Sequence, residues 1–427
     1  MKNSLGPNKR VVGTVAVLGA VALMVTGCTR AATDGGAGTG SGSTSTAAAA
    51  SPGITDTTLS LGISSPLSGP TAGPGSCSVA GLDSYLEAQN AAGGFEFGDG
   101  KTREVTLTYL DDTYDPAKAV SNYKQLVNDG IFAYVGALGT PTNAAIMPLA
   151  NKDEVPQVLL ITGASAFSKD QASNPWTFGL LPTYYTEGNT FGKLLADAGK
   201  PITVAVLSQN DDFGKDYVAG LNDAIKGTDV KVVDSATYEP TDTTLDSQVT
   251  QLANSKADVL LSAVSVTPLQ VGVLTKAQSL GWLPRIFLPS NTSTPGTVVE
   301  PGGGAAYPAV YSTSLTKVPA SPTFAEDEDV KAYNAAFEAY GSKIASVFTP
   351  HCAWSYAEGA ILGEAFKGME EPTRDSFMTA LKSIKGFDAP LLLDGISVDT
   401  TQDDQPAISG LTLVQYNGKG YAPAAAY

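Results

Sequence analysis

The sequence predicts an α/β protein built from two doubly wound parallel sheets, and three observations lead to this prediction. The chain has 427 residues, which is too long for one ordinary domain because hydrophobic cores stop growing at about 250–300 residues. From residue 54 onward, short β-branched apolar runs alternate with stretches of helical periodicity, as in parallel strands joined by helices. This alternation of strand and helix patterns runs to residue 162 and restarts near residue 186, which indicates two α/β units.

The first unit is expected to hold four strands separated by helices. The strands are 59–64, 105–110, 132–136 and 158–162, and the helices are 79–92, 116–128 and 142–150. Asp115 and Pro116 are suited to begin the second helix, as N-cap and first-turn proline.

The second unit repeats the pattern. Its strands are 202–207, 230–235, 258–262 and 286–289, and its helices are 186–198, 213–224, 245–255 and 269–280. Further helices are expected near 325–340, 353–367 and 373–384, before a strand-rich tail from Leu391. Ligands of such folds bind beyond the carboxyl ends of the strands, so those segments are where function is sought.

Composition and motifs argue against several classes of function. The chain carries 42 acidic and 26 basic residues, a net charge of −16, which disfavours binding to nucleic acid. A multi-histidine metal site is impossible with His351 alone. The chain lacks the phosphate-binding loop, the dinucleotide fingerprint and the nucleophile elbow. Asp211 and Asp212 are read as a cap for the helix that follows, with calcium as the alternative. We therefore expect no catalytic residue, no metal and no cofactor.

The N-terminus is predicted to be an export signal. Lys2, Lys9 and Arg10 precede an uncharged stretch at 11–25, which is too short for a comfortable membrane span. It ends in Val-Thr-Gly before Cys28, a pattern similar to a bacterial lipobox, in which the cysteine carries lipid. The alternatives are an ordinary signal peptide and an uncleaved anchor. We expect a signal peptide at 1–27, a lipid on Cys28 and a disordered Ala/Gly/Ser/Thr tether over 28–53.

Three segments that follow first-unit strands are rich in hydroxyl and small residues. They are 64–70, 139–143 and 163–165. Hydroxyls and free amides at helix N-termini can hold a carboxylate or another small polar group without catalysis. The same residues can also serve simply as helix caps.

Several motifs in order resemble one known family. They are Leu-Ser-Gly-Pro at 67–70, Asn-Ala-Ala-Gly-Gly at 90–94, Asp-Asp-Thr-Tyr-Asp-Pro at 111–116, Asn-Asp-Gly-Ile at 128–131 and Asp-Phe-Gly at 212–214. Their order and spacing over residues 54–427 are similar to the type I extracytoplasmic solute-binding proteins of the branched-chain amino-acid (Leu/Ile/Val-binding) branch, which serve ABC transporters.

The resemblance implies two α/β lobes joined by three hinge crossings, expected near 178–183, 308–312 and 388–395. It places residues 54–180 and 311–390 in lobe 1, and residues 181–310 and 391–427 in lobe 2. It implies a monomer that captures a small molecule, delivers it to a membrane permease and is held at the outer face of the bacterial cytoplasmic membrane.

The resemblance also implies a set of ligand-binding residues. Family positions that hold a ligand carboxylate fall on Thr140, Thr142 and the 163–165 segment, and those of the first crossing fall on 183–185. The set expected to bind ligand is Ser68, Thr140, Thr142, Ala164, Ser165, Tyr184, Tyr185, Ser265, Asn291 and His351. The resemblance further places Cys77 and Cys352 close enough on one lobe for a disulfide, the alternative being two separate buried thiols.

One departure from the family bears on the ligand. Amino-acid binders of this branch use an acid of the second lobe to hold the ligand ammonium. That position falls here on Ser290 or Asn291, and its tyrosine partner on Ser265 or Val266. Neutral groups compensate a buried ammonium poorly, so a ligand without an amino group is expected, unless Asp211 enters the cleft. The competing functions are a sensor or receptor with the same fold and an exported enzyme.

Overall fold

The first lobe is organised around a six-stranded sheet in a computed structural model, which describes residues 49–424 and 427. The strand order is β2-β3-β1-β4-β5-β6, and every pairing is parallel except that of the edge strand β2. The strands are β1 (Thr58–Ser65), β2 (Phe95–Glu96), β3 (Thr102–Asp111), β4 (Ala133–Val135), β5 (Gln157–Leu160) and β6 (Thr177–Gly179).

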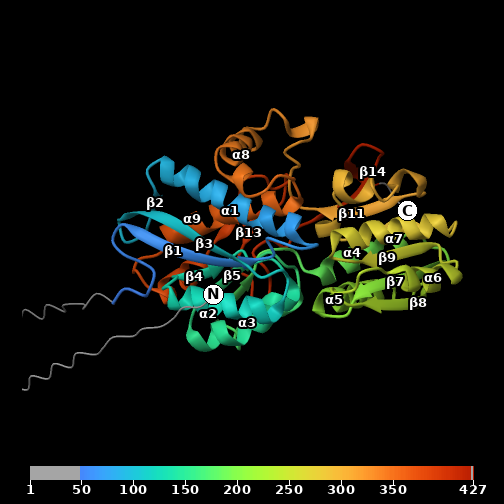
Figure 1. Cartoon of the computed structure of the whole chain (residues 1–427), viewed down its shortest axis with the longest axis horizontal. Helices are drawn as coiled ribbons and strands as arrows, with labels where there is room; N and C mark the ends of the chain where they lie inside the picture. The colour runs from blue at the N-terminus through green and yellow to red at the C-terminus, as the bar shows by residue number, and fades with distance from the viewer. Residues whose placement is uncertain (1–48, 425–426) are drawn as a thin grey trace, which may run out of the picture. The chain divides into compact units, whose positions relative to one another are not determined.

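Helices cover both faces of this sheet, with α1 and α9 on one side and α2 and α3 on the other (Figure 1). The helices of this lobe are α1 (Ala72–Ala91), α2 (Pro116–Asn128), α3 (Thr140–Asp153), α8 (Glu328–Ala339), α9 (Pro350–Lys367) and α10 (Arg374–Leu381). The predicted cap of α2 is confirmed, because the Asp115 carboxylate accepts hydrogen bonds from the amides of Ala117 (2.7 Å) and Lys118 (3.1 Å). Helices α1 and α9 cross closely at Gly81, where any Cβ would collide with the carbonyl oxygen of Cys352.

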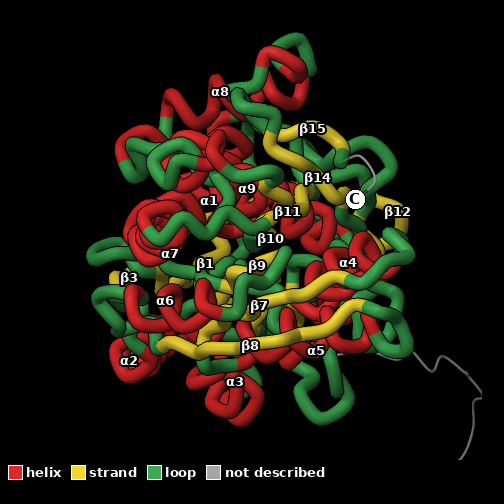
Figure 2. The backbone as a smooth tube through the Cα atoms, turned by 90° about the vertical axis from the view of Figure 1, so that its right-hand side faces the viewer, coloured by secondary structure: helices red, strands yellow, loops and turns green. Residues whose placement is uncertain are grey.

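The second lobe is built on a seven-stranded sheet with the order β15-β14-β11-β10-β9-β7-β8, and Figure 2 shows this succession from β8 at its lower edge to β15 at its upper edge. Its strands are β7 (Ile202–Gln209), β8 (Val230–Tyr238), β9 (Val259–Ala263), β10 (Arg285–Phe287), β11 (Val310–Ser314), β14 (Thr412–Tyr416) and β15 (Tyr421–Pro423). Its helices are α4 (Tyr184–Ala196), α5 (Asp212–Ile225), α6 (Asp246–Asn254) and α7 (Thr267–Ser279). The first five strands in sequence pair in parallel, and β14 and β15 add antiparallel strands.

Three crossings join the two sheets. The first runs from the end of β6 to the start of α4 at Tyr184, as the sequence predicts. The second follows Ser314, because β11 still pairs in the second sheet whereas Leu315 belongs to the core under the first. The third lies between Ile408, which packs in that same core, and the start of β14 at Thr412. The second and third crossings therefore lie farther along the chain than the predicted 308–312 and 388–395.

The segment 391–408 packs with the first lobe, whereas the sequence assigned residues 391–427 to the second. Leu392, Val398 and Ile408 are buried in the first-lobe core, and β13 (Val398–Asp399) pairs with β12 (Lys385–Phe387). The amides of Ala407 and Ile408 also donate to the carbonyls of Gly179 and Leu180, each over 2.9 Å. The first and third crossings are thus tied together by backbone hydrogen bonds.

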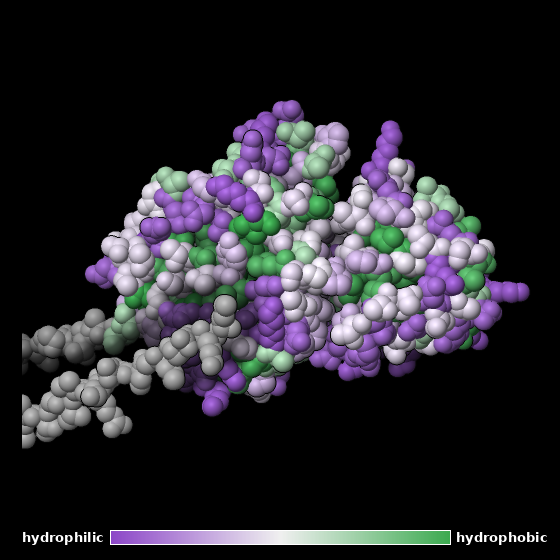
Figure 3. Space-filling view, viewed as in Figure 1, coloured by the Kyte–Doolittle hydropathy of each residue, from purple (hydrophilic) through white to green (hydrophobic). Residues whose placement is uncertain are grey.

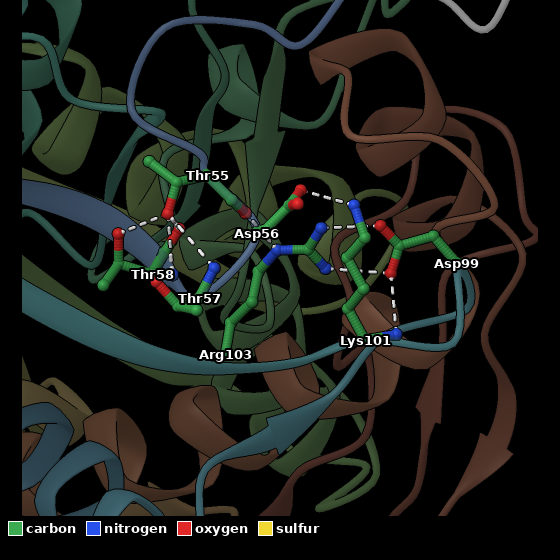
Figure 4. A network of polar contacts seen from close by, with 7 residues as sticks. All are labelled: Thr55, Asp56, Thr57, Thr58, Asp99, Lys101 and Arg103. Carbon is green, nitrogen blue, oxygen red and sulfur yellow. Dashed lines mark hydrogen bonds and ion pairs between the residues drawn. The ribbon is translucent and has the colours of Figure 1, made fainter.

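A buried guanidinium secures the start of the first sheet. Arg103 on β3 is 1% exposed and donates to both carboxylate oxygens of Asp99 (2.9 and 2.6 Å) and to the carbonyl of Thr55 (2.6 Å) (Figure 4). Lys101 pairs with Asp56 beside it. Because an unpaired buried charge is very costly, this network fixes the sheet edge.

The last residues of the predicted tether also lie on the first lobe. The Ser51 amide donates to the Pro372 carbonyl (2.9 Å), and the Ser51 hydroxyl accepts from the Arg374 amide (3.1 Å). The predicted signal peptide at 1–27, Cys28 and the tether as far as residue 48 lie outside the described residues. No helix within residues 49–424 has the length and apolar character needed to cross a membrane.

Candidate ligand-binding site

A small cavity of about 20 Å³ lies between the two lobes, where the carboxyl ends of the central strands of both sheets meet. The first lobe contributes residues that follow β1, β3, β4 and β5, and the second lobe contributes residues that follow β7, β9 and β10. The lining residues are Thr71, Pro74, Tyr114, Leu138, Gly139, Thr140, Ile161, Tyr184, Phe213, Ser265, Asn291, His351 and Trp354. This is the location that the doubly wound topology predicts.

Two threonines of the first lobe supply hydroxyl groups to the cavity. Thr140 is the first residue of α3, is 3% exposed, and its Oγ1 lies 2.8 Å from the Oγ1 of Thr162. Thr71 precedes α1, is 4% exposed, and its Oγ1 has no hydrogen-bond partner. A buried hydroxyl without a partner is costly, so Thr71 is available to donate to a ligand.

Five helices begin at this cavity. From the first lobe, α1, α3 and α9 begin beside it at Thr71, Gly139 and His351, and from the second lobe α4 and α5 begin at Tyr184 and Phe213. The first turns of α1, α3 and α9 hold no acidic residue. Because a helix N-terminus presents unpaired N–H groups and a partial positive charge, their convergence favours an anionic group.

The second lobe offers polar groups that are already arranged by a hydrogen-bond network. The Ser265 hydroxyl donates to Gln209 Oε1 over 2.5 Å, and the same oxygen accepts from the Tyr238 hydroxyl over 2.7 Å. The Ser265 amide donates to the Tyr238 oxygen over 2.9 Å. Asn291, just after β10, has a buried Oδ1 without a partner. The second lobe therefore presents fixed neutral groups to the cavity.

Aromatic rings form much of the remaining wall. Tyr184 and Phe213 meet edge to face with centroids 4.7 Å apart. Tyr114 stands in a strained turn, because both it and Thr113 have positive φ angles of 63° and 54°. The Asp112 carboxylate, which accepts from the Tyr114 amide over 2.8 Å, holds this turn in place. Such strain persists only where the surroundings enforce it, and it is common at functional sites.

His351 is a neutral member of the site. Burial lowers its pKa to about 3, so the ring is uncharged near neutral pH. Its Nδ1 lies 3.0 Å from the hydroxyl oxygen of Thr349, and its ring meets that of Trp354 at 4.7 Å between centroids. His351 can therefore pack on a ligand or exchange a hydrogen bond with it, and it supplies no positive charge.

Among the described residues, no charged side chain lines the cavity. Asp211, the acid considered from the sequence, caps α5 by accepting from the amides of Phe213 (3.0 Å) and Gly214 (3.4 Å). Its other oxygen accepts from the amide group of Gln209 over 2.6 Å. The predicted cap is confirmed, and both carboxylate oxygens of Asp211 already have partners.

Half of the predicted ligand-binding residues line this cavity. They are Thr140, Tyr184, Ser265, Asn291 and His351. The other five lie elsewhere, and side-chain hydrogen bonds explain why for three of them. Ser68 donates to Asp111 (2.6 Å), Thr142 donates to the carbonyls of Leu138 and Gly139 (3.2 Å each) and Tyr185 donates to Asp223 (2.8 Å). The Ser165 amide donates to Asp216 (2.6 Å), and its buried hydroxyl has no hydrogen-bond partner. Ala164 is buried in the core without lining the cavity.

Sequence reasoning missed Thr71, Tyr114, Phe213 and Trp354. Trp354 lies three residues after His351 and hence on the same face of α9, which is a signal that the sequence offers. Tyr114 belongs to the recognised Asp-Asp-Thr-Tyr motif, but its direction depends on two consecutive left-handed residues. Such a backbone is rare for residues other than glycine, and the sequence pattern gives no sign of it.

A disulfide joins two of the helices that begin at the cavity. Cys77 on α1 and Cys352 on α9 are bonded, with their Cα atoms 4.4 Å apart. Cys77 lies three residues after Pro74, and Cys352 follows His351. The bond therefore fixes the two helix starts with respect to each other.

Two α/β lobes, three crossings and a cavity between the carboxyl ends of two sheets define the class of bilobal solute-binding proteins. The chain belongs to the periplasmic binding protein family, whose model matches residues 58–421. The family that the motifs indicated and the predicted fold class are thereby confirmed.

Comparison with individual proteins identifies relatives of this branch. The chain is 28% identical over 177 residues to a leucine-, isoleucine-, valine-, threonine- and alanine-binding protein of Pseudomonas aeruginosa, covering 41% of this chain and 45% of that protein. It is 27% identical over 208 residues to a Leu/Ile/Val-binding protein homolog of Brucella melitensis, covering 47% and 53%. The chain thus spans about half the length of the curated relatives it matches.

Solved structures match the fold over most of the chain. A fatty acid ABC transporter substrate-binding protein from Thermomonospora curvata has a TM-score of 0.74 at 21% identity, covering 88% of this chain and 94% of that one. An ABC transporter solute-binding protein from R. palustris in complex with benzoate has a TM-score of 0.70 at 17% identity, covering 86% and 95%. At these identities the likeness shows the fold.

Proposed function

We propose that this chain is the extracytoplasmic substrate-binding component of an ABC importer, which captures a small carboxylate-bearing solute between its lobes and delivers it to a membrane permease. One observation carries this proposal. The cavity between the lobes has no charged lining residue in the described chain, yet three helices without an acidic residue in their first turn, α1, α3 and α9, begin at it. Such a site stabilises a negative group and offers no charged partner for an ammonium.

The relatives are consistent with an acidic ligand group. Their names refer to leucine, isoleucine, valine, threonine and alanine, to a fatty acid and to benzoate, and all of these molecules carry a carboxylate. A site that lacks an acid for the ammonium is better suited to the last two kinds of ligand than to an α-amino acid.

The proposed mechanism is closure of the lobes on the ligand. A cavity of about 20 Å³ has room for roughly one water molecule, so entry of a solute requires the lobes to separate. Thr140, Thr71 and the first-lobe helix N-termini receive the carboxylate in the open form. Contacts with Ser265 and Asn291 form only on closure, and this differential contact drives the change of conformation.

Ligand screening by thermal shift tests the ligand class. Amino acids, carboxylates, amides and sugars are compared, because a bound ligand raises the melting temperature by mass action. We expect carboxylates without an amino group to stabilise the protein and saturating ligand to decrease the radius of gyration in X-ray scattering. An α-amino acid that binds tightly and loses its affinity when its amino group is removed would overturn the ligand assignment.

Substitution of Thr140 tests the site itself. Thr140→Val should weaken carboxylate binding by about 1–3 kcal/mol, because a buried acceptor loses its donor, whereas Thr140→Ser keeps the hydroxyl and serves as the matched control. Equal affinities of the valine variant and the wild type in calorimetry would remove Thr140 from the site.

The membrane attachment is part of the same proposal. A lipid on Cys28 and a flexible segment after it would hold the two lobes near the permease while leaving them free to reorient.

A further inference from the structure

A second cavity shares one wall with the candidate ligand-binding cavity. It has a volume of about 90 Å³, against about 20 Å³ for the first. Trp354 lines both cavities, and the neighbouring residues Ser290 and Asn291 line the second and the first respectively. The indole ring of Trp354 and the turn after β10 therefore belong to a wall that the two cavities share.

The wall of the second cavity is apolar in character. Both lobes contribute to it, with Val318, Phe348 and Pro350 from the segments around α8 and α9, and Val414 from β14. Five serine and threonine residues also line it, and the hydroxyls of four of them are engaged in other hydrogen bonds, whereas the buried hydroxyl of Tyr421, another lining residue, has no hydrogen-bond partner. Ser290 and Thr313 donate to Glu187 (2.7 and 2.8 Å), Ser293 donates to the carbonyl of Ser290 (3.3 Å) and Ser314 donates to that of Thr316 (3.1 Å).

The apolar character continues to the protein surface. Val318, which lines the cavity, is 42% exposed, and Val347, adjacent to Phe348, is 47% exposed. Figure 3 shows apolar residues reaching the surface in the hollow between the regions of α8 and β14. Contiguous apolar surface that leads into a cavity can form part of a ligand-binding groove.

We propose that the ligand is an amphiphilic carboxylate whose aliphatic chain occupies the second cavity. Its carboxylate lies at the helix N-termini near Thr140, and its chain passes the ring of Trp354, which turns aside to join the two spaces. This inference rests on the proposed function and specifies its ligand class. The observation behind it is that a polar, anion-favouring cavity and a larger apolar one share Trp354 as a common wall, because this pair of spaces matches the two ends of such a molecule.

A series of straight-chain carboxylates tests this inference. Binding of butyrate, hexanoate, octanoate and decanoate to the intact protein is measured by calorimetry. We expect affinity to rise about fourfold for each methylene that enters the second cavity, since each buried methylene contributes about 0.8 kcal/mol. The rise should stop when the chain reaches solvent at the mouth near Val318.

Two matched variants distinguish a loss of affinity caused by blocking the second cavity from a general effect of placing a tryptophan on the protein surface. Val318→Trp narrows the second cavity at its mouth, and Val233→Trp places the same ring at another exposed valine, which is 47% exposed on β8. The first variant should bind butyrate as the wild type does and lose at least tenfold in affinity for decanoate. The second should match the wild type for both ligands.

The outcomes distinguish this inference from the proposed function. Butyrate binding that depends on Thr140, with no gain in affinity for longer chains, overturns the second cavity as a ligand site and leaves the proposed function standing. Equal decanoate affinities of the two tryptophan variants also overturn it. Binding of no carboxylate of any length overturns both.

Discussion

Replacing His351 should change how the stability of the protein depends on pH. The ring is 3% exposed, and burial lowers its pKa from 6.5 to about 3. Between these two values the unfolded chain binds a proton at this position and the folded protein does not. Protonation therefore favours unfolding, and the stability that His351 contributes is present above about pH 6.5 and is lost as the pH falls toward 3.

The size of the effect follows from the same two pKa values. Each pH unit below 6.5 costs about 1.4 kcal/mol, so lowering the pH from 7 to 4.5 should cost the wild type about 3 kcal/mol at this residue. Asp83 and Asp112 act in the opposite sense, because burial raises the pKa of each to about 6. Their contribution is the same in wild type and variant, so it cancels in a comparison.

Urea denaturation of the wild type and of His351→Gln at pH 7 and pH 4.5 measures the difference. The glutamine variant should be less stable at pH 7, because it loses the packing of the ring against Trp354. At pH 4.5 the gap should close by about 3 kcal/mol or reverse. A gap that is the same at both pH values would show that the pKa of His351 in the folded protein is close to its value in the unfolded chain, and would refute the reasoning.

Three further predictions concern other parts of the chain. The double change Cys77→Ser and Cys352→Ser opens a loop that spans a sequence separation of 275 residues; it should cost up to about 5 kcal/mol of unfolding free energy and weaken ligand binding, and an unchanged melting temperature would contradict this. Glu187→Ala leaves two hydroxyls and one amide without their buried acceptor and should cost about 3 kcal/mol in urea denaturation, whereas Glu187→Gln keeps an acceptor and should cost less; similar losses in both would refute the hydrogen-bond explanation. Cys28→Ala should release the protein from the membrane fraction of cells, and retention with normal processing would exclude lipidation.

The fold was predictable from the sequence because its signals are local. Apolar runs and helix caps depend only on residues that are close in the sequence. The caps Asp115 and Asp211 both occur where the pattern indicates them. The paths of the second and third crossings depend instead on which sheet receives a strand. Strand β11 inserts between β10 and β14, and nothing in its sequence distinguishes this from a place in the first sheet.

The site residues likewise fall into those that local sequence signals predict and those whose position depends on the three-dimensional fold. Thr140, Ser265 and Asn291 follow strands directly, so topology alone brings them to the cavity. Thr142 lies only two residues beyond Thr140, yet its hydroxyl bonds to its own helix, because the turn of the helix carries it away from the cavity. Trp354 reaches the cavity from α9, which begins at Pro350, far along the chain from the end of β6 at Gly179, so the order of strands and helices does not by itself bring this ring to the cavity.

The placement of positive potential in backbone groups has a consequence for how fast an anionic solute is captured. At long range such a solute meets a protein of net charge −16, which repels it over distances of about 8 Å at physiological ionic strength and about 30 Å in dilute solution. Inside the cleft the same solute meets the peptide dipoles at the N-termini of α1, α3 and α9, which hold no titratable proton and are shielded from dissolved ions. Added salt should therefore raise the association rate constant of the anionic ligand without raising its dissociation rate constant. The protein should capture such a ligand faster at high ionic strength than at low ionic strength.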